Sequence, residues 1–206
     1  MLVLAADTSL PLLSVALVDG ESLIGSVALE GKGSRNEKLL PAIDWLLSES
    51  NVERSRIDLF AVTRGPGSFT GVRIGLATIQ GLALVLDRPV CAMSTHEAIA
   101  AGESAGNIVV IDDAGRGEYY LSRFEHHREV VAPRLASASE AGEISAGAAV
   151  VRTSDFLRRS NVAASCARRA LEIAQRSELD RYADATPIYV RLAEAEVKLQ
   201  QKKNAG

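Results

Sequence analysis

The stretch that most constrains the fold is a glycine-rich turn between two apolar segments, running from Thr63 to Gly75. Before it, Ile57 to Val62 is an apolar run with the length and the β-branched or aromatic content of a strand. After it, Ile74 to Leu86 is an apolar segment of helical length. Pro66 fixes its own φ and the glycines on either side allow positive φ, so the chain turns sharply here. The sequence therefore predicts a strand, a tight turn and a helix start.

The start of this helix has the geometry that suits an anion. Ser68 or Thr70 can cap the helix by accepting a bond from a free backbone N–H. The helix dipole then favours a negative charge, although no lysine follows the glycines as in a Walker A loop. Arg73 lies in the first turn, where the dipole disfavours a cation, so we expect it to serve a ligand, a partner or an acidic neighbour. The alternative is a simple strand-to-helix turn.

The N-terminal part of the chain predicts a meander of three strands. Leu2 to Ala6, Leu12 to Val18 and Leu23 to Leu29 are apolar runs separated by short turns. The first run ends in an acid and two hydroxyls, a set that can orient a metal or water at a phosphate. These candidate phosphate-proximal residues are Asp7, Thr8 and Ser9. The alternative is a turn held together by its own side chains.

Two helices carry the candidate partner interface. The first helix follows a capping box that begins at Ser34. This helix ends near Glu49 and carries an apolar stripe on one face. Trp45 falls off this stripe, so it is either an exposed contact anchor or packed under a loop. The second helix has small residues three and four apart, which let another helix approach closely; packing inside its own subunit is the alternative. The candidate interface residues are Leu39, Leu40, Ile43, Leu46, Leu47, Gly71, Arg73, Ile74, Gly75 and Thr78.

A second α/β half is expected after residue 102. We predict two subdomains, residues 1–102 with the two partner helices and residues 103–206 with a smaller sheet and a charged tail. Asn107 to Ile111 and Tyr119 to Phe124 have the pattern of strands. Beyond Pro133 the pattern weakens, and it indicates only a helix, a strand and a further helix.

Composition and short motifs exclude several classes of function. A formal net charge of −3 gives no basic signal for direct RNA binding. Cys91 and Cys166 form no metal or redox motif. His96 opens an H-E-x-x-H pattern that Ala100 breaks, so no zinc site is predicted. The chain starts without a basic n-region and has no run of membrane-spanning length, so a cytoplasmic location is expected.

The central stretch also carries a family resemblance. Gly65 to Gly75 closely resembles the signature of the TsaB (YeaZ) family, which belongs to the actin, sugar kinase and Hsp70 superfamily. The start at Asp7, the strand at Gly117 to Tyr120 and the segment Pro187 to Arg191 resemble the family as well. The resemblance implies an actin-like ATPase (ribonuclease H-like) fold, with two related halves that each hold a mixed sheet flanked by helices. The chain departs from the usual family pattern at two positions, Asn36 and Gly115.

The resemblance implies a non-catalytic subunit of the machinery that makes threonylcarbamoyladenosine next to the tRNA anticodon. In the family this subunit binds and activates the catalytic subunit TsaD, mainly through the first two helices, and joins TsaE in an ATP-dependent complex. It pairs with a second copy when TsaD is absent and meets tRNA only through the complex. The resemblance implies no catalytic residue, no metal and no cofactor for the isolated chain, with ATP a component of the assembled complex.

Two other classes of function stay open at this point. One is a stand-alone ATP-dependent small-molecule kinase of the same superfamily, which needs a complete cleft with a second catalytic acid in the second half. The other is a metallopeptidase, which needs a metal pair that the chain's three histidines, His96, His126 and His127, do not supply by their spacing.

Overall fold

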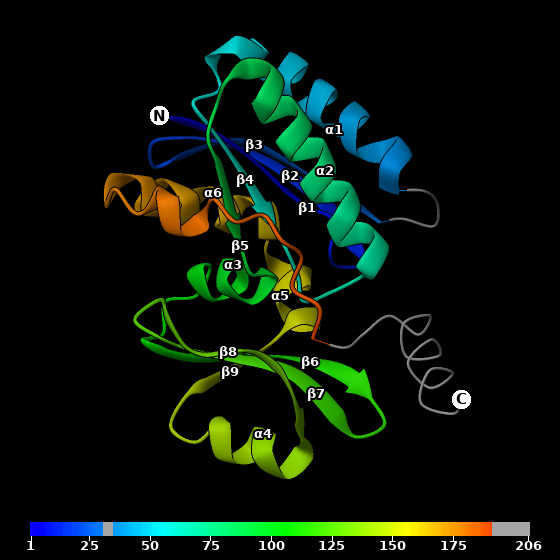
Figure 1. Ribbon diagram of the computed structural model, residues 1–206, viewed down its shortest axis with the longest axis vertical. Helices are drawn as coiled ribbons and strands as arrows, with labels where there is room; N and C mark the ends of the chain where they lie inside the picture. Colours follow the sequence, from blue (N-terminus) through cyan, green and yellow to red (C-terminus); the bar gives the residue numbers. More distant parts are fainter. Residues whose placement is uncertain (31–34, 191–206) are drawn as a thin grey trace, which may run out of the picture.

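The computed structural model describes residues 1–30 and 35–190 as alternating layers of helix and sheet (Figure 1). The predicted α/β class, with two mixed sheets flanked by helices, is confirmed. The expected cap at Ser34 and the tail beyond residue 190 lie outside the described residues. In chain order the elements are β1 (Leu2–Asp7), β2 (Leu12–Asp19), β3 (Ser22–Glu30), α1 (Arg35–Glu49), η1 (Arg54–Arg56), β4 (Leu59–Thr63), α2 (Phe69–Leu86), β5 (Val90–Met93), α3 (Thr95–Ala101), β6 (Asn107–Gly115), β7 (Glu118–Glu125), β8 (Arg128–Ser137), α4 (Ala138–Ile144), β9 (Ala149–Arg152), α5 (Thr153–Arg159), α6 (Val162–Gln175) and η2 (Leu179–Tyr182).

The first sheet has the strand order β3-β2-β1-β4-β5. The expected meander forms its antiparallel part, because β1 pairs with β2 and β2 with β3 in opposite directions. The strand before the glycine turn, β4, runs parallel to β1 and to β5. All residues of β1 and β4 are buried, as is typical of parallel strands that helices cover on both faces.

The second sheet has the order β8-β7-β6-β9 and repeats the arrangement of the first four strands of the other sheet. Its central strand β6 pairs antiparallel with β7 and parallel with β9. Ala6 is the last residue of β1 that pairs with the parallel strand β4, and Ile111 is the last residue of β6 that pairs with the parallel strand β9. An aspartate follows each of these two residues. Asp7 and Asp112 therefore occupy equivalent positions in the two halves.

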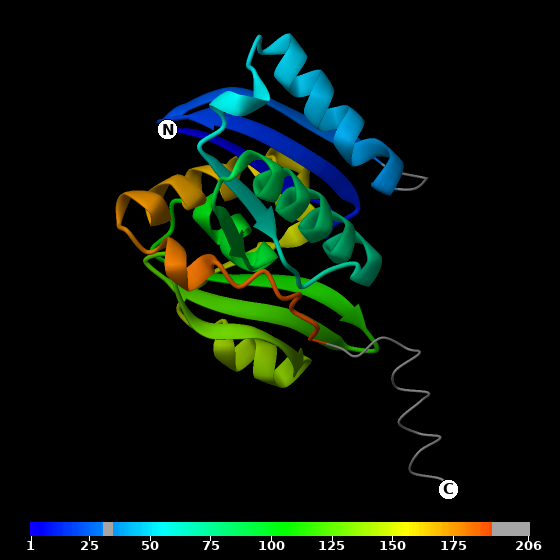
Figure 2. The ribbon, with the colours of Figure 1, turned by 45° about the horizontal axis from the view of Figure 1, so that its top comes forward.

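Three hydrophobic clusters hold the layers together. The first lies between the outer face of the first sheet and helices α1 and α2. The second and largest lies between the two sheets and contains residues of α3, α5 and α6. The third lies between the second sheet and α4. Figures 1 and 2 show the result: α1 and α2 at one end, α4 at the other, and the remaining helices sandwiched between the sheets.

The expected boundary near residue 102 falls between the sheets but does not separate the helices. Helix α6 follows the second sheet in the chain, yet it packs against β1, β2 and β4 of the first sheet. The backbone N–H of Ala163 in α6 donates to Ser14 Oγ in β2 at 3.2 Å. The chain then returns to the glycine turn, where the N–H of Ile188 donates to the carbonyl of Arg64 at 2.7 Å. The C-terminal part therefore completes the core of the first half, and the division into 1–102 and 103–206 stays a prediction.

Two elements of the second half were not predicted from the sequence. β8 is an edge strand whose residues alternate between exposed and half-buried, and it contains Pro133, which an edge strand tolerates because one side of it forms no ladder. Helix α5 is only 7 residues long. His126 and His127 lie in the turn between β7 and β8, both with positive φ, rather than on a strand.

Candidate functional site

The end of β1 forms a sealed polar cluster, which we call the β1 corner (Asp7, Thr8 and Ser9). Asp7 Oδ1 accepts hydrogen bonds from Ser9 Oγ and Thr63 Oγ1, both at 2.5 Å, and from the Ser9 N–H at 3.1 Å. Thr8 Oγ1 donates to the carbonyl of Gly71 at 2.6 Å, and Ser9 Oγ contacts Thr95 Oγ1 at 2.9 Å. The three corner residues are 0%, 1% and 2% exposed. These side chains therefore join β1, β4, α2 and α3 to one another.

The Asp7 carboxyl is buried at a cost. Burial raises the pKa of Asp7 above its ordinary value, and the hydrogen bonds from Ser9 and Thr63 offset only part of that effect. Its second oxygen, Oδ2, is buried and accepts no hydrogen bond from the described residues. A raised pKa means that the folded state favours the protonated carboxyl more than the unfolded chain does, so the stability that Asp7 contributes is fully present only below its unfolded pKa of about 3.8.

We expect Asp7→Asn to remove this contribution to the pH dependence of stability. The contribution of Asp7 is lost as pH rises through the raised pKa, so the free energy of unfolding of the parent chain should fall relative to that of the variant between about pH 4 and pH 8. Urea unfolding at several pH values measures the difference. Parallel pH profiles for the two proteins would show that Asp7 is not the titrating group.

The glycine turn packs directly onto the β1 corner. A Cβ at Gly67 would lie 2.4 Å from the carbonyl oxygen of Ser9, so only glycine fits. The N–H of Ser68 donates to that same carbonyl at 2.7 Å, and the Ser68 hydroxyl caps α2 by accepting from the N–H of Gly71. The backbone N–H groups of Ser68 and Gly71, which belong to the predicted anion site, thus bind groups of the protein itself. This agrees with the alternative prediction of a simple strand-to-helix turn.

A small cavity opens between the glycine turn and the second sheet. It has a volume of about 250 Å³ and is lined by Ser9, Gly67, Ser68, Asp112 and Tyr120, with two prolines and a leucine. Of the three corner residues that were predicted to lie near a phosphate, only Ser9 borders it. The volume is below the usual range of ligand pockets, about 300–1,000 Å³.

Asp112 faces this cavity, and the sequence does not mark it as a site residue. The pattern predicts a turn at this position, whereas Asp112 lies inside β6. Burial raises the pKa of its carboxyl, the N–H of Asp113 partly offsets this effect, and the charge of Asp113 adds to it. The signal that reveals it is the strand register, because Asp112 is the counterpart of Asp7 in the second half.

The apolar stripe of α1 faces the chain's own core. Four of the predicted interface residues on this helix are at most 4% exposed and belong to the cluster beneath the first sheet: Leu39, Ile43, Leu46 and Leu47. Their side chains therefore pack within the chain, and their place in a partner interface stays a prediction. An apolar stripe on a helix can pack on a partner or on the chain's own sheet, and here it packs on the sheet. On the solvent face, Leu40 is 45% and Trp45 is 55% exposed.

The small residues of α2 also point inward. A Cβ on Gly75 would lie 2.4 Å from Thr8 Oγ1, and Gly71 is buried with its carbonyl bonded to the same hydroxyl. The glycines do allow a close approach, as predicted, but the approaching group is Thr8 of the same chain. This packing agrees with the alternative of contacts inside the subunit, and a partner interface at Gly71 and Gly75 stays a prediction. Arg73, Ile74 and Thr78 lie toward the other side of α2 and border a shallow hollow of about 330 Å³.

Arg73 binds aromatic neighbours within its own chain. Its guanidinium lies 3.9 Å from the centre of the Phe69 ring, and its Nε donates to Tyr189 Oη at 2.7 Å. Tyr189 stacks on Phe69 with ring centres 4.7 Å apart. A cation over two aromatic faces explains an arginine at a helix start that the dipole disfavours. The segment before residue 190 is thereby fastened to the start of α2.

The exposed face of α2 is strongly apolar. Leu84 and Val85 are each 83% exposed, and α1 runs beside α2 on the same outer face of the sheet (Figures 1 and 2). By length and composition alone, α2 could cross a membrane, but one third of it is buried inside the chain, where Val72, Leu76 and Ile79 pack on the sheet. Large apolar side chains left in solvent mark an interaction surface. We call this surface the outer helix face (Leu40, Trp45, Ile74, Leu84 and Val85).

The duplicated sheet order, with an acid at the end of each central strand, defines a protein of the actin-like, ribonuclease H-like class. The family model described as "TsaD: tRNA N6-adenosine threonylcarbamoyltransferase" matches residues 32–190. The chain belongs to the TsaB (YeaZ) family within that group.

Individual relatives agree with this assignment. The chain is 32% identical to the tRNA threonylcarbamoyladenosine biosynthesis protein TsaB of Haemophilus influenzae, over 91% of this chain and 92% of that protein. It is 34% identical to the Bacillus subtilis TsaB over 61% of this chain, and this match spans only 56% of that relative's length. The crystal structure of YeaZ from Pseudomonas aeruginosa superposes with a TM-score of 0.71 at 26% identity, covering 91% of this chain and 99% of that one.

Proposed function

We propose that this chain is a non-catalytic subunit of the tRNA threonylcarbamoyladenosine machinery and that it binds the catalytic subunit TsaD through the outer helix face. The observation that carries the proposal is the pair of adjacent side chains Leu84 and Val85, which are 83% exposed on a helix whose opposite side is buried. Side chains of this kind gain free energy when a partner covers them. The family assignment supports TsaD as the partner.

The proposal leaves the chemistry to the partner. Within residues 1–30 and 35–190, no group of three histidine, cysteine, aspartate or glutamate side chains is placed to hold a metal ion. The β1 corner is sealed, and its hydroxyls bind protein groups. We therefore assign the chain a supporting role, in the cytoplasm, with TsaE and ATP joining only the assembled complex and tRNA meeting the chain only there.

The outer helix face also suits a second copy of the chain when TsaD is absent. A homodimer would cover the same exposed side chains, so TsaD and a second copy would compete for them. Sedimentation of the isolated chain with and without TsaD tests this point, because the homodimer should disappear as TsaD is added.

We expect the double variant Leu84→Glu/Val85→Glu to weaken binding to TsaD by at least about 30-fold. Buried interface anchors often contribute about 2 kcal/mol or more each, and 1.4 kcal/mol corresponds to a factor of ten. Both side chains are largely in solvent, so the isolated chain should keep its fold. Titration calorimetry with purified TsaD gives the dissociation constants, and circular dichroism checks the fold.

A matched control separates this face from exposed apolar residues in general. Val150 is 49% exposed on β9 of the second sheet, so Val150→Glu adds the same charge far from α2. This variant should bind TsaD as the parent does. If the double variant also binds TsaD with unchanged affinity, the outer helix face is not the interface.

A further inference from the structure

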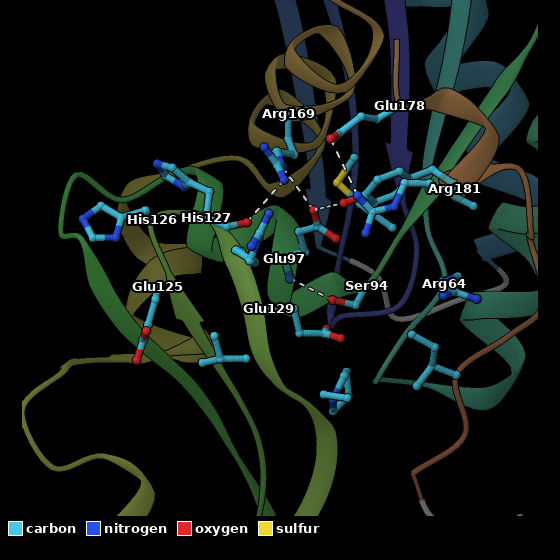
Figure 3. Close-up of a pocket in the computed structure, with 18 of the residues that line it drawn as sticks. Arg64, Ser94, Glu97, Glu125, His126, His127, Glu129, Arg169, Glu178 and Arg181 are labelled. Carbon is cyan, nitrogen blue, oxygen red and sulfur yellow. Dashed lines mark hydrogen bonds and ion pairs between the residues drawn. The ribbon is translucent and has the colours of Figure 1, made fainter. Parts of the chain in front are cut away.

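A cavity lies between α3, η2 and the turn that joins β7 to β8. It has a volume of about 980 Å³, the size of an ordinary small-molecule site. Figure 3 shows Glu97 and Glu129 in the middle of this cavity, with Arg64 and Arg181 on one side and His126 and His127 on the other. We call it the charged pocket.

A fixed ion pair forms the floor of the charged pocket. Glu97 is 8% and Arg169 is 5% exposed. Glu97 Oε1 accepts from Arg169 Nε at 3.0 Å and from Tyr182 Oη at 2.8 Å. The second carboxylate oxygen of Glu97, Oε2, accepts no hydrogen bond from the described residues. The floor therefore presents a rigid carboxylate with one free oxygen.

Other polar groups around the pocket lack partners as well. Arg64 Nε and His127 Nδ1 are buried and form no hydrogen bond with the described residues. Buried polar atoms are nearly always paired, so two such atoms in one cavity require an explanation. The side chains of Arg128, Glu129 and Arg176 also line the pocket; they are exposed to solvent and form no hydrogen bond or ion pair with other described residues.

The unpaired groups carry both signs of charge. Glu97 Oε2 and the Glu129 carboxylate can accept from an ammonium group, with His127 Nδ1 as a further acceptor in one tautomer. The pKa of Glu129 is raised by burial and by the nearby Glu97, while the charge of Arg64 lowers it. Arg64 Nη1 already binds Asp184 and the carbonyl of Thr186, so its Nε and the Arg176 guanidinium are the groups left to donate to an acid group.

We propose that the charged pocket binds a small organic zwitterion, a molecule with a primary ammonium group and a carboxylate, as in free amino acids. The ammonium lies between Glu97 and Glu129, and the carboxylate lies toward Arg64 and Arg176. A simple metal ion fits less well, because the described residues offer no group of three converging metal ligands. The pocket does not involve the outer helix face, so this inference stands apart from the proposed partner.

Four five-carbon or four-carbon probes test the need for both charges. L-Norvaline carries the two groups on one carbon, 5-aminopentanoate carries them at opposite ends, and butylammonium and pentanoate carry one each. Titration of the isotope-labelled chain, followed by amide NMR shifts of Ser94, His127 and Tyr182, gives the dissociation constants. We expect at least one zwitterion to bind about tenfold more tightly than either singly charged probe.

Matched variants locate the binding. Glu129→Gln and Arg176→Gln should each weaken binding of the tighter-binding zwitterion by about tenfold. Glu143→Gln and Arg168→Gln remove the same charges from exposed positions outside the pocket and should leave binding unchanged. The proposal is overturned if neither zwitterion shifts these signals at about 10 mM, if a singly charged probe binds as tightly, or if both pocket variants bind like the parent.

Discussion

Replacing Gly67 by alanine is expected to lower the free energy of unfolding by about 3–5 kcal/mol. The added Cβ would lie 2.4 Å from the carbonyl oxygen of Ser9 and 2.9 Å from its carbonyl carbon, distances that real structures do not show. Gly67 also has φ +156°, a conformation that alanine rarely adopts. Ser9 cannot retreat easily, because its N–H and hydroxyl bind Asp7 and its carbonyl binds Ser68.

A second glycine provides the control for this prediction. Gly81 lies in α2 and is exposed, and no atom lies within 4 Å of the position that a Cβ would occupy there. Gly81→Ala should therefore stabilise the chain by about 0.5–1 kcal/mol, the helix-propensity difference between the two residues. Urea unfolding of both variants gives the comparison. A Gly67→Ala protein as stable as the parent would show that the glycine turn does not rest on the β1 corner in solution.

The sequence predicted the elements with strong local patterns. The apolar runs of β1 to β4 and the Ser68 cap follow from periodicity and capping chemistry, and the structure confirms them. β8 could not be predicted with the same means, because an exposed edge strand has a weak apolar alternation and Pro133 interrupts it. Local patterns report local structure, and they fade where a strand is half in solvent.

The direction of the helix faces was beyond the sequence for a different reason. The stripe that includes Leu39 and Ile43 predicts burial, but periodicity does not say whether a sheet or a partner covers it. Trp45 lies off this stripe and is exposed, and on the apolar helix α2 Leu84 and Val85 are exposed as well. The proposed outer contact rests on this exposure, which the sequence pattern does not report.

Pairings between distant residues were also invisible in the sequence. Asp112 became a counterpart of Asp7 only through the register of two separate sheets. Glu97 stands out in the sequence only as part of a broken zinc motif, whereas its actual partner Arg169 lies 72 residues further along the chain. Its role depends on how α6 returns to the first half, a feature of topology that no local pattern records.

Because α6 returns to the first half of the chain, Arg169 is a second position where a substitution is expected to change the free energy of unfolding strongly. Its guanidinium binds Glu97 on α3 at 3.0 Å, Glu172 on α6 at 3.1 Å and the carbonyl of His127 at 3.2 Å. One 5% exposed side chain thus connects α3, α6 and the turn between β7 and β8. Removing one partner of a buried ion pair leaves the other charge buried without compensation, which typically costs about 3–5 kcal/mol.

We expect Arg169→Met to lower the free energy of unfolding by about 3–5 kcal/mol. Methionine fills much of the same volume, so the loss reports the charge rather than a cavity. Urea unfolding of the parent and the variant measures the loss.

Two further variants identify the origin of the effect. Arg168→Met changes the exposed neighbour on the same helix and should alter stability by no more than about 0.5 kcal/mol. Adding Glu97→Gln to Arg169→Met removes the stranded charge, so the double variant should recover much of the loss. If Glu97→Gln restores nothing, then packing of the arginine stem, rather than its charge, holds α3 and α6 together.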